Sequence, residues 1–215
     1  MISLSVKTQT LGRAWIELVE RVVREGTRMG EEGLELLGRT VHFSAATELD
    51  DVLERFADRE MVQEMQKVFF SEGLNALGHS YAKLICGPGG RHDLHDVIDL
   101  LKKEPATKRA LITFASQPGG KVPCITALQF LIRDDALQLM YFARGQDVFR
   151  KFYADALCLG RIGDRVGKAL SVPLGLVRGF IGSAHIYHHD MAAIQKAIAA
   201  VQQYTAAQLA EGTLA

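Results

Sequence analysis

Two apolar runs separated by one pair of aspartates place the strongest constraint on the fold of this chain. Residues 124–133 and 136–143 have the composition of β-strands, and only Asp134-Asp135 lies between them. A two-residue connection made of turn-forming residues predicts a β-hairpin. The second half of the chain is therefore expected to contribute an antiparallel pair of strands.

The rest of the chain mixes helical and strand-like patterns rather than alternating them strictly. Helical spacing of apolar residues predicts helices over residues 11–24, 50–56, 59–70, 93–103, 148–170 and 191–209. Gly160 and Gly163 are candidate breaks in the 148–170 helix. Further strands are expected over residues 37–43, 110–114 and 174–186, and glycine-rich loops over 26–33 and 86–90. This mixture favours an α+β fold, and the absence of a linker or repeat favours a single domain over residues 1–215.

Composition and charge exclude several classes of function. Lys+Arg and Asp+Glu both number 25 in 215 residues, so the net charge gives no support for a nucleic-acid partner. No stretch reaches the roughly 18 apolar residues needed to span a bilayer, and residues 1–7 lack the apolar core of a signal peptide. Three scattered cysteines do not make a disulfide framework or a zinc site, and His188-His189-Asp190 alternates faces if it is strand. We therefore expect a cytoplasmic protein with reduced thiols, no membrane contact and no metal.

A proline-cysteine pair heads the predicted hairpin. Pro123 fixes its own φ angle, so the Cys124 thiol sits on a stiff backbone, although a lone cysteine in such a run is more often a buried core residue. Gln129-Phe130, Arg144-Gly145-Gln146-Asp147 and His185-Ile186-Tyr187 follow in that order. This order resembles the thymidylate synthase family, with its Pro-Cys nucleophile, Gln-Phe pair, Arg-x-x-Asp segment and His-x-Tyr segment.

The resemblance implies a thymidylate synthase-like catalytic domain with a mixed sheet flanked by helices, in a homodimer with shared active sites. It implies a nucleoside monophosphate and 5,10-methylenetetrahydrofolate as substrates, and one-carbon chemistry at C5 of a pyrimidine. Cys124 would add to C6 as a thiolate, which turns C5 into a carbon nucleophile. Arg144 would bind the nucleotide phosphate, and as a nearby cation it would lower the pKa of the Cys124 thiol.

Further residues match binding positions of that family. Lys108-Arg109, after Glu104-Pro105, resembles a pair that reaches the partner's nucleotide phosphate across the dimer interface, with lysine in place of the first arginine. His185 and Tyr187 match a pair that hydrogen-bonds the sugar hydroxyl, and their spacing on a strand puts them on one face. Asp147 matches an aspartate that contacts the folate pterin; capping the following helix is the ordinary role of such a residue.

Two residues match the proton-handling groups of the family. Glu64 lies in a predicted helix where the family places its catalytic glutamate, with Glu60 as a rival one turn earlier. An exposed helix glutamate is the alternative interpretation. Tyr81, in Tyr81-Ala82-Lys83, resembles a tyrosine that helps to remove the C5 proton, and a half-buried structural tyrosine is the alternative.

The resemblance makes Asp155 the position expected to distinguish one pyrimidine base from another. Uracil-methylating members of the family carry an asparagine eight residues after the Arg-x-x-Asp aspartate, and here that position is Asp155. An amide donates and accepts, which matches uracil, whereas an ionised aspartate only accepts, which suits the 4-amino group of cytosine. An ordinary helix surface residue is the alternative. Members that hydroxymethylate cytidylates have aspartate there, so the resemblance implies a CMP or dCMP 5-hydroxymethyltransferase in which water, rather than a folate hydride, completes the reaction.

Departures from the family keep two other functions open. Trp15 is the only tryptophan, so the active-site tryptophans of the family have no counterpart. Ile125 follows the cysteine where many members have histidine, and Gly145 replaces a phosphate-binding serine. The arginine-rich loop that follows the first helix in the family has no close match here, with Arg28 as a candidate. The alternatives are a thymidylate synthase that methylates dUMP, and a nucleotide-binding homologue without turnover.

Overall fold

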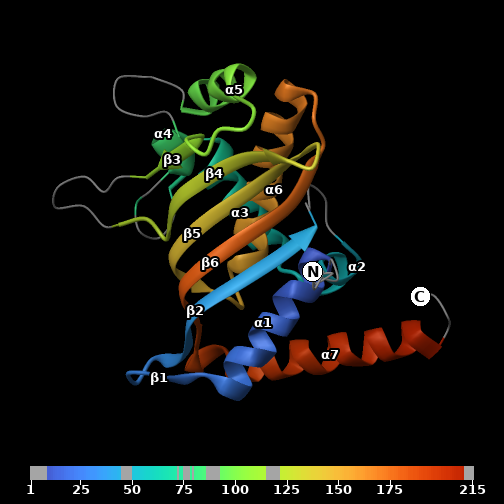
Figure 1. Ribbon diagram of the computed structural model, residues 1–215. Helices are drawn as coiled ribbons and strands as arrows, with labels where there is room; N and C mark the ends of the chain where they lie inside the picture. Colours follow the sequence, from blue (N-terminus) through green and yellow to red (C-terminus); the bar gives the residue numbers. More distant parts are fainter. Residues whose placement is uncertain are drawn as a thin grey trace, which may run out of the picture.

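The computed structural model describes residues 9–44, 50–71, 73–74, 78, 80–85, 93–114 and 122–210 (Figure 1). The loop predicted over residues 86–90 lies outside these ranges. The helices are α1 (Leu11–Glu25), α2 (Asp51–Phe56), α3 (Arg59–Phe70), α4 (Tyr81–Ile85), α5 (Asp93–Lys103), α6 (Phe152–Leu170), the 3-10 turn η1 (His188–Asp190) and α7 (Met191–Ala210). The strands are β1 (Thr27–Met29), β2 (Gly33–Ser44), β3 (Leu111–Thr113), β4 (Ile125–Arg133), β5 (Ala136–Asp147) and β6 (Leu174–Tyr187).

One mixed sheet organises the described part of the chain. Its strand order is β1-β2-β6-β5-β4-β3, and β5 and β6 are parallel whereas the other neighbours are antiparallel. The β4–β5 hairpin turns at Asp134-Asp135, whose φ angles of 52° and 56° are those of the tight turns that match strand twist. The predicted hairpin and the α+β fold with a mixed sheet are both confirmed.

Two predictions about local structure are wrong. Helix α6 runs unbroken through Gly160 and Gly163, and at Gly163 the glycine allows close packing rather than a break. A Cβ added at Gly163 would lie 2.8 Å from Cδ1 of Leu174 and 3.4 Å from Cδ2 of Leu139, so the bare backbone lets the helix approach the sheet. The loop predicted over residues 26–33 contains strand β1, which pairs with β2 across Gly30 at a φ of 58°.

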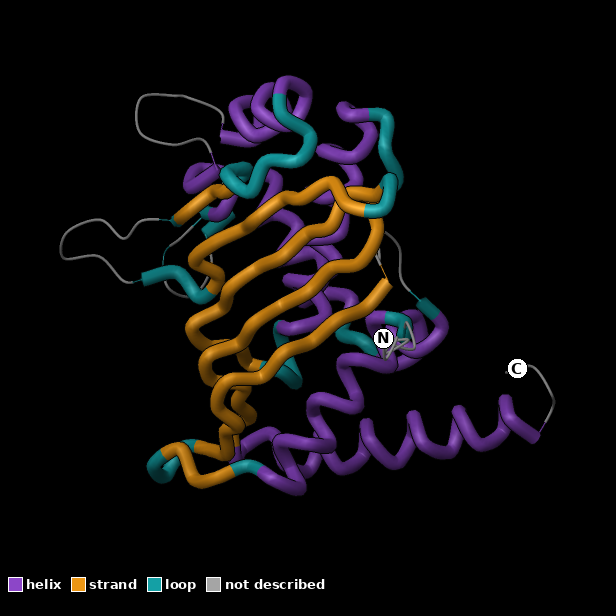
Figure 2. Tube along the Cα trace, viewed as in Figure 1, coloured by secondary structure: helices purple, strands orange, loops and turns teal. Residues whose placement is uncertain are grey.

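One face of the sheet is covered by helices, and the core lies there. In Figures 1 and 2, α3 and α6 stand behind the strands. Helix α1 also anchors the turn that precedes α6, since Nε1 of Trp15 donates to the carbonyl oxygen of Phe149 at 3.2 Å. The Trp15 ring lies 4.6 Å from that of Tyr153, whose hydroxyl accepts from the backbone N–H of Asp58 at 3.2 Å. Elements distant in sequence therefore fix the backbone between β5 and α6.

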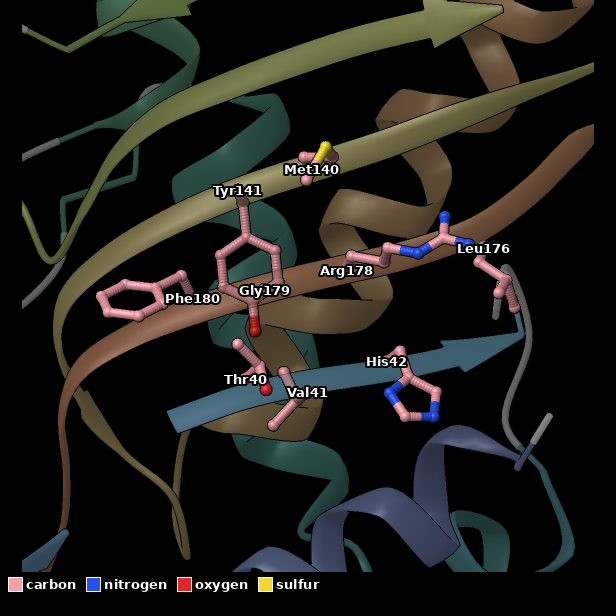
Figure 3. Close-up of a pocket in the computed structure, with 9 residues that line it drawn as sticks. All are labelled: Thr40, Val41, His42, Met140, Tyr141, Leu176, Arg178, Gly179 and Phe180. Atoms are coloured by element: carbon pink, nitrogen blue, oxygen red, sulfur yellow. The ribbon is translucent and has the colours of Figure 1, made fainter. Parts of the chain in front are cut away.

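The other face of the sheet is open over its central strands. Phe142 on β5 and Phe180 on β6 stack with ring centroids 5.5 Å apart, yet 39% and 44% of their surfaces are exposed. Beside them lies a depression of about 340 Å³ between β2, β5 and β6, shown in Figure 3. At its floor the Tyr141 ring lies over Gly179, where an added Cβ would come within 2.2 Å of the ring. Such an apolar area is typical of an interface rather than of free surface.

Among the helices that the structure describes, none combines the length and apolarity that crossing a membrane requires.

Candidate active site

Cys124 lies just before β4, where its backbone is held by the end of β5. The Cys124 carbonyl oxygen accepts from the backbone N–H of Arg144 at 2.9 Å. The Arg144 guanidinium donates from Nη2 to the carbonyl oxygen of Val122 at 2.7 Å, and from Nε to that of Pro123 at 3.2 Å. The thiol is half-buried. One arginine thus clamps the backbone on the amino-terminal side of the candidate nucleophile.

Tyr81 is hydrogen-bonded to the same segment, at the residue after Cys124. Its hydroxyl accepts from the backbone N–H of Ile125 at 3.0 Å, and its ring stacks on Phe69 with centroids 4.4 Å apart. Burial and the charge of Asp155 raise the pKa of Tyr81, so its hydroxyl stays protonated. Because the Tyr81 oxygen accepts from Ile125, its proton remains available to a further acceptor.

Asp155 is a buried carboxyl group with one unpartnered oxygen. It projects from α6, and its Oδ2 accepts from Nε2 of Gln146 on β5 at 2.7 Å. Oδ1 is buried and has no hydrogen-bond partner among the residues that the structure describes. Burial raises the pKa of Asp155 to about 7, although the Gln146 hydrogen bond and the charge of Lys151 act in the opposite direction. A buried acceptor without a donor is unfavourable, and it marks a position that a ligand donor can fill.

Nearby acidic and basic groups shift the pKa of the Cys124 thiol in opposite directions. Burial raises the pKa of this thiol, and the charges of Asp155 and Asp147 raise it further. Arg144 and Lys151 lower it. Arg144 therefore acts in the direction that the sequence predicted, but the net shift is upward. The pKa of the thiol is raised overall because the loss of hydration outweighs the effect of the nearby cation.

Asp147 ends β5 and stabilises the turn that leads into α6. Its Oδ1 accepts from the backbone N–H groups of Phe149 at 3.2 Å and of Arg150 at 2.9 Å. Burial raises its pKa, and these two hydrogen bonds act against that shift. The capping role is therefore present in the turn before α6 rather than at the helix itself. The predicted contact with a folate pterin stays a prediction.

His185 and Tyr187 lie together on β6, beside the end of β5. Their rings meet edge to face with centroids 5.4 Å apart. In the parallel β5–β6 register Asp147 lies opposite His185, and the Tyr187 pKa is raised by burial and by the charges of Asp147 and Cys124, among others. The structure therefore brings this pair, Asp147 and Cys124 to one end of the sheet.

Three predicted site residues lie apart from the cluster, which consists of Cys124, Tyr81, Arg144, Asp147, Asp155, His185 and Tyr187. Glu64 is on the exposed side of α3, and no hydrogen bond or ion pair within the described ranges joins it to Cys124, Tyr81 or Asp155. Arg109 is exposed beside β3 and donates to both carboxylate oxygens of Glu104, at 2.8 and 2.6 Å. The adjacent Lys108 is exposed as well. Their roles stay predictions.

Sequence reasoning missed two residues beside the cluster. Gln146 lies inside the Arg-x-x-Asp segment, and only the packing of β5 against α6 shows that it binds Asp155. Lys151 precedes Asp155 by four residues, and that helical spacing was the available signal.

Side chains of the His188-His189-Asp190 segment contact other residues of the protein. Asp190 is buried and paired with Arg150, and His189 stacks on Tyr187 with ring centroids 5.4 Å apart. In the part of the chain that the structure describes, no group of three or more His, Cys, Asp or Glu side chains is placed to hold a metal ion.

The chain is similar in sequence to one family of known proteins. The family model for thymidylate synthase matches residues 56–211. A protein of Methanococcoides burtonii described as "Putative thymidylate synthase" is 25% identical over 207 residues, which cover 92% of this chain and 95% of that protein. Proteins with the same description from Methanothermobacter thermautotrophicus and Methanocaldococcus jannaschii are 22% and 23% identical, cover 86% of this chain, and are themselves covered over 94% and 90% of their lengths.

The raised pKa of Asp155 predicts a specific pH dependence of stability. Between the unfolded pKa, about 4, and the folded pKa of about 7, the folded protein holds a proton that the unfolded chain has lost, so stability falls as pH rises through this window. Asp155→Asn removes this loss. The free energy of unfolding is measured by urea denaturation at each pH. The difference between Asp155→Asn and wild type is expected to move in favour of the variant by roughly 2–3 kcal/mol from pH 5 to pH 8. Asp164→Asn, at a partly exposed position of α6, is the control; an equal gain there would contradict the assignment.

Proposed function

Since the chain belongs to the thymidylate synthase family, whose chemistry is one-carbon transfer to C5 of a pyrimidine nucleotide, we propose that it converts CMP or dCMP to the 5-hydroxymethyl nucleotide. The co-substrate is 5,10-methylenetetrahydrofolate. The observation that carries the proposal is the unpartnered, buried Oδ1 of Asp155 next to the site of Cys124. A carboxylate in that place requires a donor from its ligand, and the 4-amino group of cytosine is such a donor.

The Gln146 hydrogen bond supports this choice of base. It commits Oδ2 of Asp155 as an acceptor and leaves Oδ1 for the substituent at C4 of the pyrimidine. When ionised, Oδ1 accepts from the cytosine amine and repels the O4 of uracil. An asparagine in its place would turn its oxygen toward Gln146 and present its amide N–H groups, which match O4. Asp155 therefore selects cytosine through the geometry that Gln146 imposes.

The remaining residues of the cluster have assigned places around the nucleotide. His185 and Tyr187 hydrogen-bond the sugar hydroxyl. Arg144 binds the phosphate through its Nη1 edge, since Nε and Nη2 hold the backbone at Val122 and Pro123. Asp147 uses only Oδ1 for its turn, so Oδ2 is left to bind the pterin.

Each chemical step uses a group of this chain. The Cys124 thiolate adds to C6, and the electron pair of the C5–C6 double bond makes C5 nucleophilic. When bound, methylenetetrahydrofolate supplies the one-carbon unit that C5 takes up. Tyr81 and Glu64, acting through water, are assigned removal of the C5 proton, and the electron pair of the C5–H bond expels tetrahydrofolate, which leaves an exocyclic methylene group on C5. Water then adds to the exocyclic methylene group, and Cys124 leaves C6, which gives the hydroxymethyl product.

The open face of the sheet is the proposed dimer interface. Phe142, Phe180 and Met140 expose an apolar area on the central strands, and a second copy of this face would cover it. Arg109 and Lys108 are exposed and lie outside the cluster of their own protomer. In the dimer they would reach the phosphate site of the partner. The active sites are therefore proposed to be shared between two protomers.

The function is tested by incubating the protein with methylenetetrahydrofolate and each of CMP, dCMP, UMP and dUMP, then measuring the mass of the nucleotide. A gain of one CH2O by a cytidylate is expected. Cys124→Ser is expected to abolish turnover, because a hydroxyl is a poor nucleophile for this addition, and to keep nucleotide affinity within about threefold. Nucleotide affinity is measured by isothermal titration calorimetry. Methylated dUMP would show a thymidylate synthase, and binding without any product a homologue without turnover.

The base preference is tested at Asp155. Asp155→Asn is expected to lower kcat/KM for CMP and dCMP at least tenfold and to admit UMP or dUMP, because the amide donor suits O4. All four values of kcat/KM are measured in both proteins. A wild-type preference for a uridylate, or an unchanged preference in the variant, would refute the role given to Asp155.

The dimer is tested by its mass in solution. Wild type is expected at twice the chain mass of 23.7 kDa by light scattering, and Phe180→Asp is expected to be monomeric and inactive. Leu209→Asp, at an exposed apolar residue on α7, is the control that stays dimeric. Mixing Cys124→Ser with Arg109→Ala protomers is expected to regain up to about a quarter of wild-type activity if sites are shared. A monomeric wild type, or a mixture without activity, counts against the shared site.

A further inference from the structure

The proposed reaction needs two anions close together. Cys124 must add as a thiolate, and Asp155 must be ionised to accept from the cytosine amine. The charge of Asp155 raises the pKa of the Cys124 thiol, and Asp147 raises the pKa of both groups. Both groups are also largely removed from water, which disfavours either charge. The site therefore needs a cation that acts on both positions.

Arg144 does not meet this need. It favours the Cys124 thiolate, but its guanidinium donates to the carbonyl oxygens of Val122 and Pro123, which precede the nucleophile in the chain. It is not among the charges that act on Asp155. Its remaining donors are assigned to the nucleotide phosphate.

Lys151 is the residue whose position suits a cation acting on both Cys124 and Asp155. The Lys151 backbone N–H donates to the carbonyl oxygen of Asp147 at 3.2 Å, and the N–H of Asp155 donates to that of Lys151 at 2.9 Å. Residues joined by two consecutive i to i+4 bonds project from one side of a helical turn. Lys151 thus lies between the two aspartates along the chain and is half-buried, and its charge acts on both Cys124 and Asp155.

The backbone that carries Lys151 is fixed independently of any ligand. Trp15 donates to the carbonyl oxygen of Phe149, and Oδ1 of Asp147 accepts from the N–H groups of Phe149 and Arg150. These bonds hold the turn just before Lys151. The backbone of Lys151 is therefore ordered before any ligand binds. Less conformational entropy is then lost when the ammonium group is held at the site.

We propose that Lys151 is a positioning residue whose ammonium group is the common counter-charge of Cys124 and Asp155. This role rests on the proposed function. When sulfur bonds to C6, the C5–C6 electron pair moves into the ring, so negative charge leaves the sulfur and arrives on the pyrimidine beside Asp155. No proton moves in this step. A cation near both ends stabilises the charge before and after the bond forms.

The test is the pH dependence of Cys124 alkylation by iodoacetamide, followed on the Cys124 peptide by mass spectrometry in the full chain. Lys151→Met is expected to move the midpoint upward by about one pH unit, which slows alkylation at neutral pH up to tenfold. Lys151→Arg restores the profile because it keeps the charge. Lys168→Met, on the same helix and paired with Asp164, is the matched control. The other groups acting on Cys124, namely Arg144 and Asp147 of β5 and Asp155 of α6, are unchanged throughout, as are the neighbouring Tyr81 and Tyr187.

Turnover provides the second readout. In Lys151→Met, kcat/KM with the accepted cytidylate is expected to fall at least tenfold, because both the Cys124 thiolate and the ionised Asp155 lose their counter-charge. An unmoved alkylation midpoint overturns the inference, as does a loss that Lys151→Arg fails to rescue. If Lys151→Met does not fold, Lys151→Gln carries the same measurement. A shifted midpoint in a protein that converts no cytidylate would support the role of Lys151 and refute the proposed function, so the two failures are distinct.

Discussion

Strand β5 is hydrogen-bonded antiparallel to β4 on one side and parallel to β6 on the other, and the positions at the candidate site follow from these two registers. The antiparallel edge brings Arg144 to the backbone of Cys124. The parallel edge sets Asp147 opposite His185. The intervening Gln146 is buried against α6, where it meets Asp155. A shift of one residue in either register would exchange the faces of the strand and separate these groups.

The cost of this arrangement is electrostatic. Three acidic groups, the Cys124 thiol and the carboxyls of Asp147 and Asp155, are brought together where little water reaches them, and the pKa of each is raised by burial. Removing charged groups from water is expensive unless partners replace the lost hydration. The structure supplies Gln146 and the turn N–H groups as such partners, but leaves Oδ1 of Asp155 without one. A site that is incomplete without its ligand gains most from the ligand that completes it.

The same sheet separates two functions by face. Its helix-covered side holds the core, and its open side carries Phe142 and Phe180 at the surface. Glycine at 179 lets Tyr141 lie across a neighbouring strand, so the core is packed tightly without side chains protruding there. A partner molecule can therefore bind the open face without displacing the core.

The sequence by itself determined the local elements and the residue types of the site. The turn at Asp134-Asp135 and the apolar spacing of α3 and α5 act within a few residues of chain, so their signals survive in the sequence alone. The family motifs likewise named Cys124 and Asp155 before any contact was known. The tertiary structure decided the rest: the unbroken α6, the orphan oxygen of Asp155, the Gln146 bond and the upward shift of the Cys124 thiol pKa. These properties depend on which distant segments exclude water from a group and which donors they bring, and that information arises only when β4, β5 and α6 pack together.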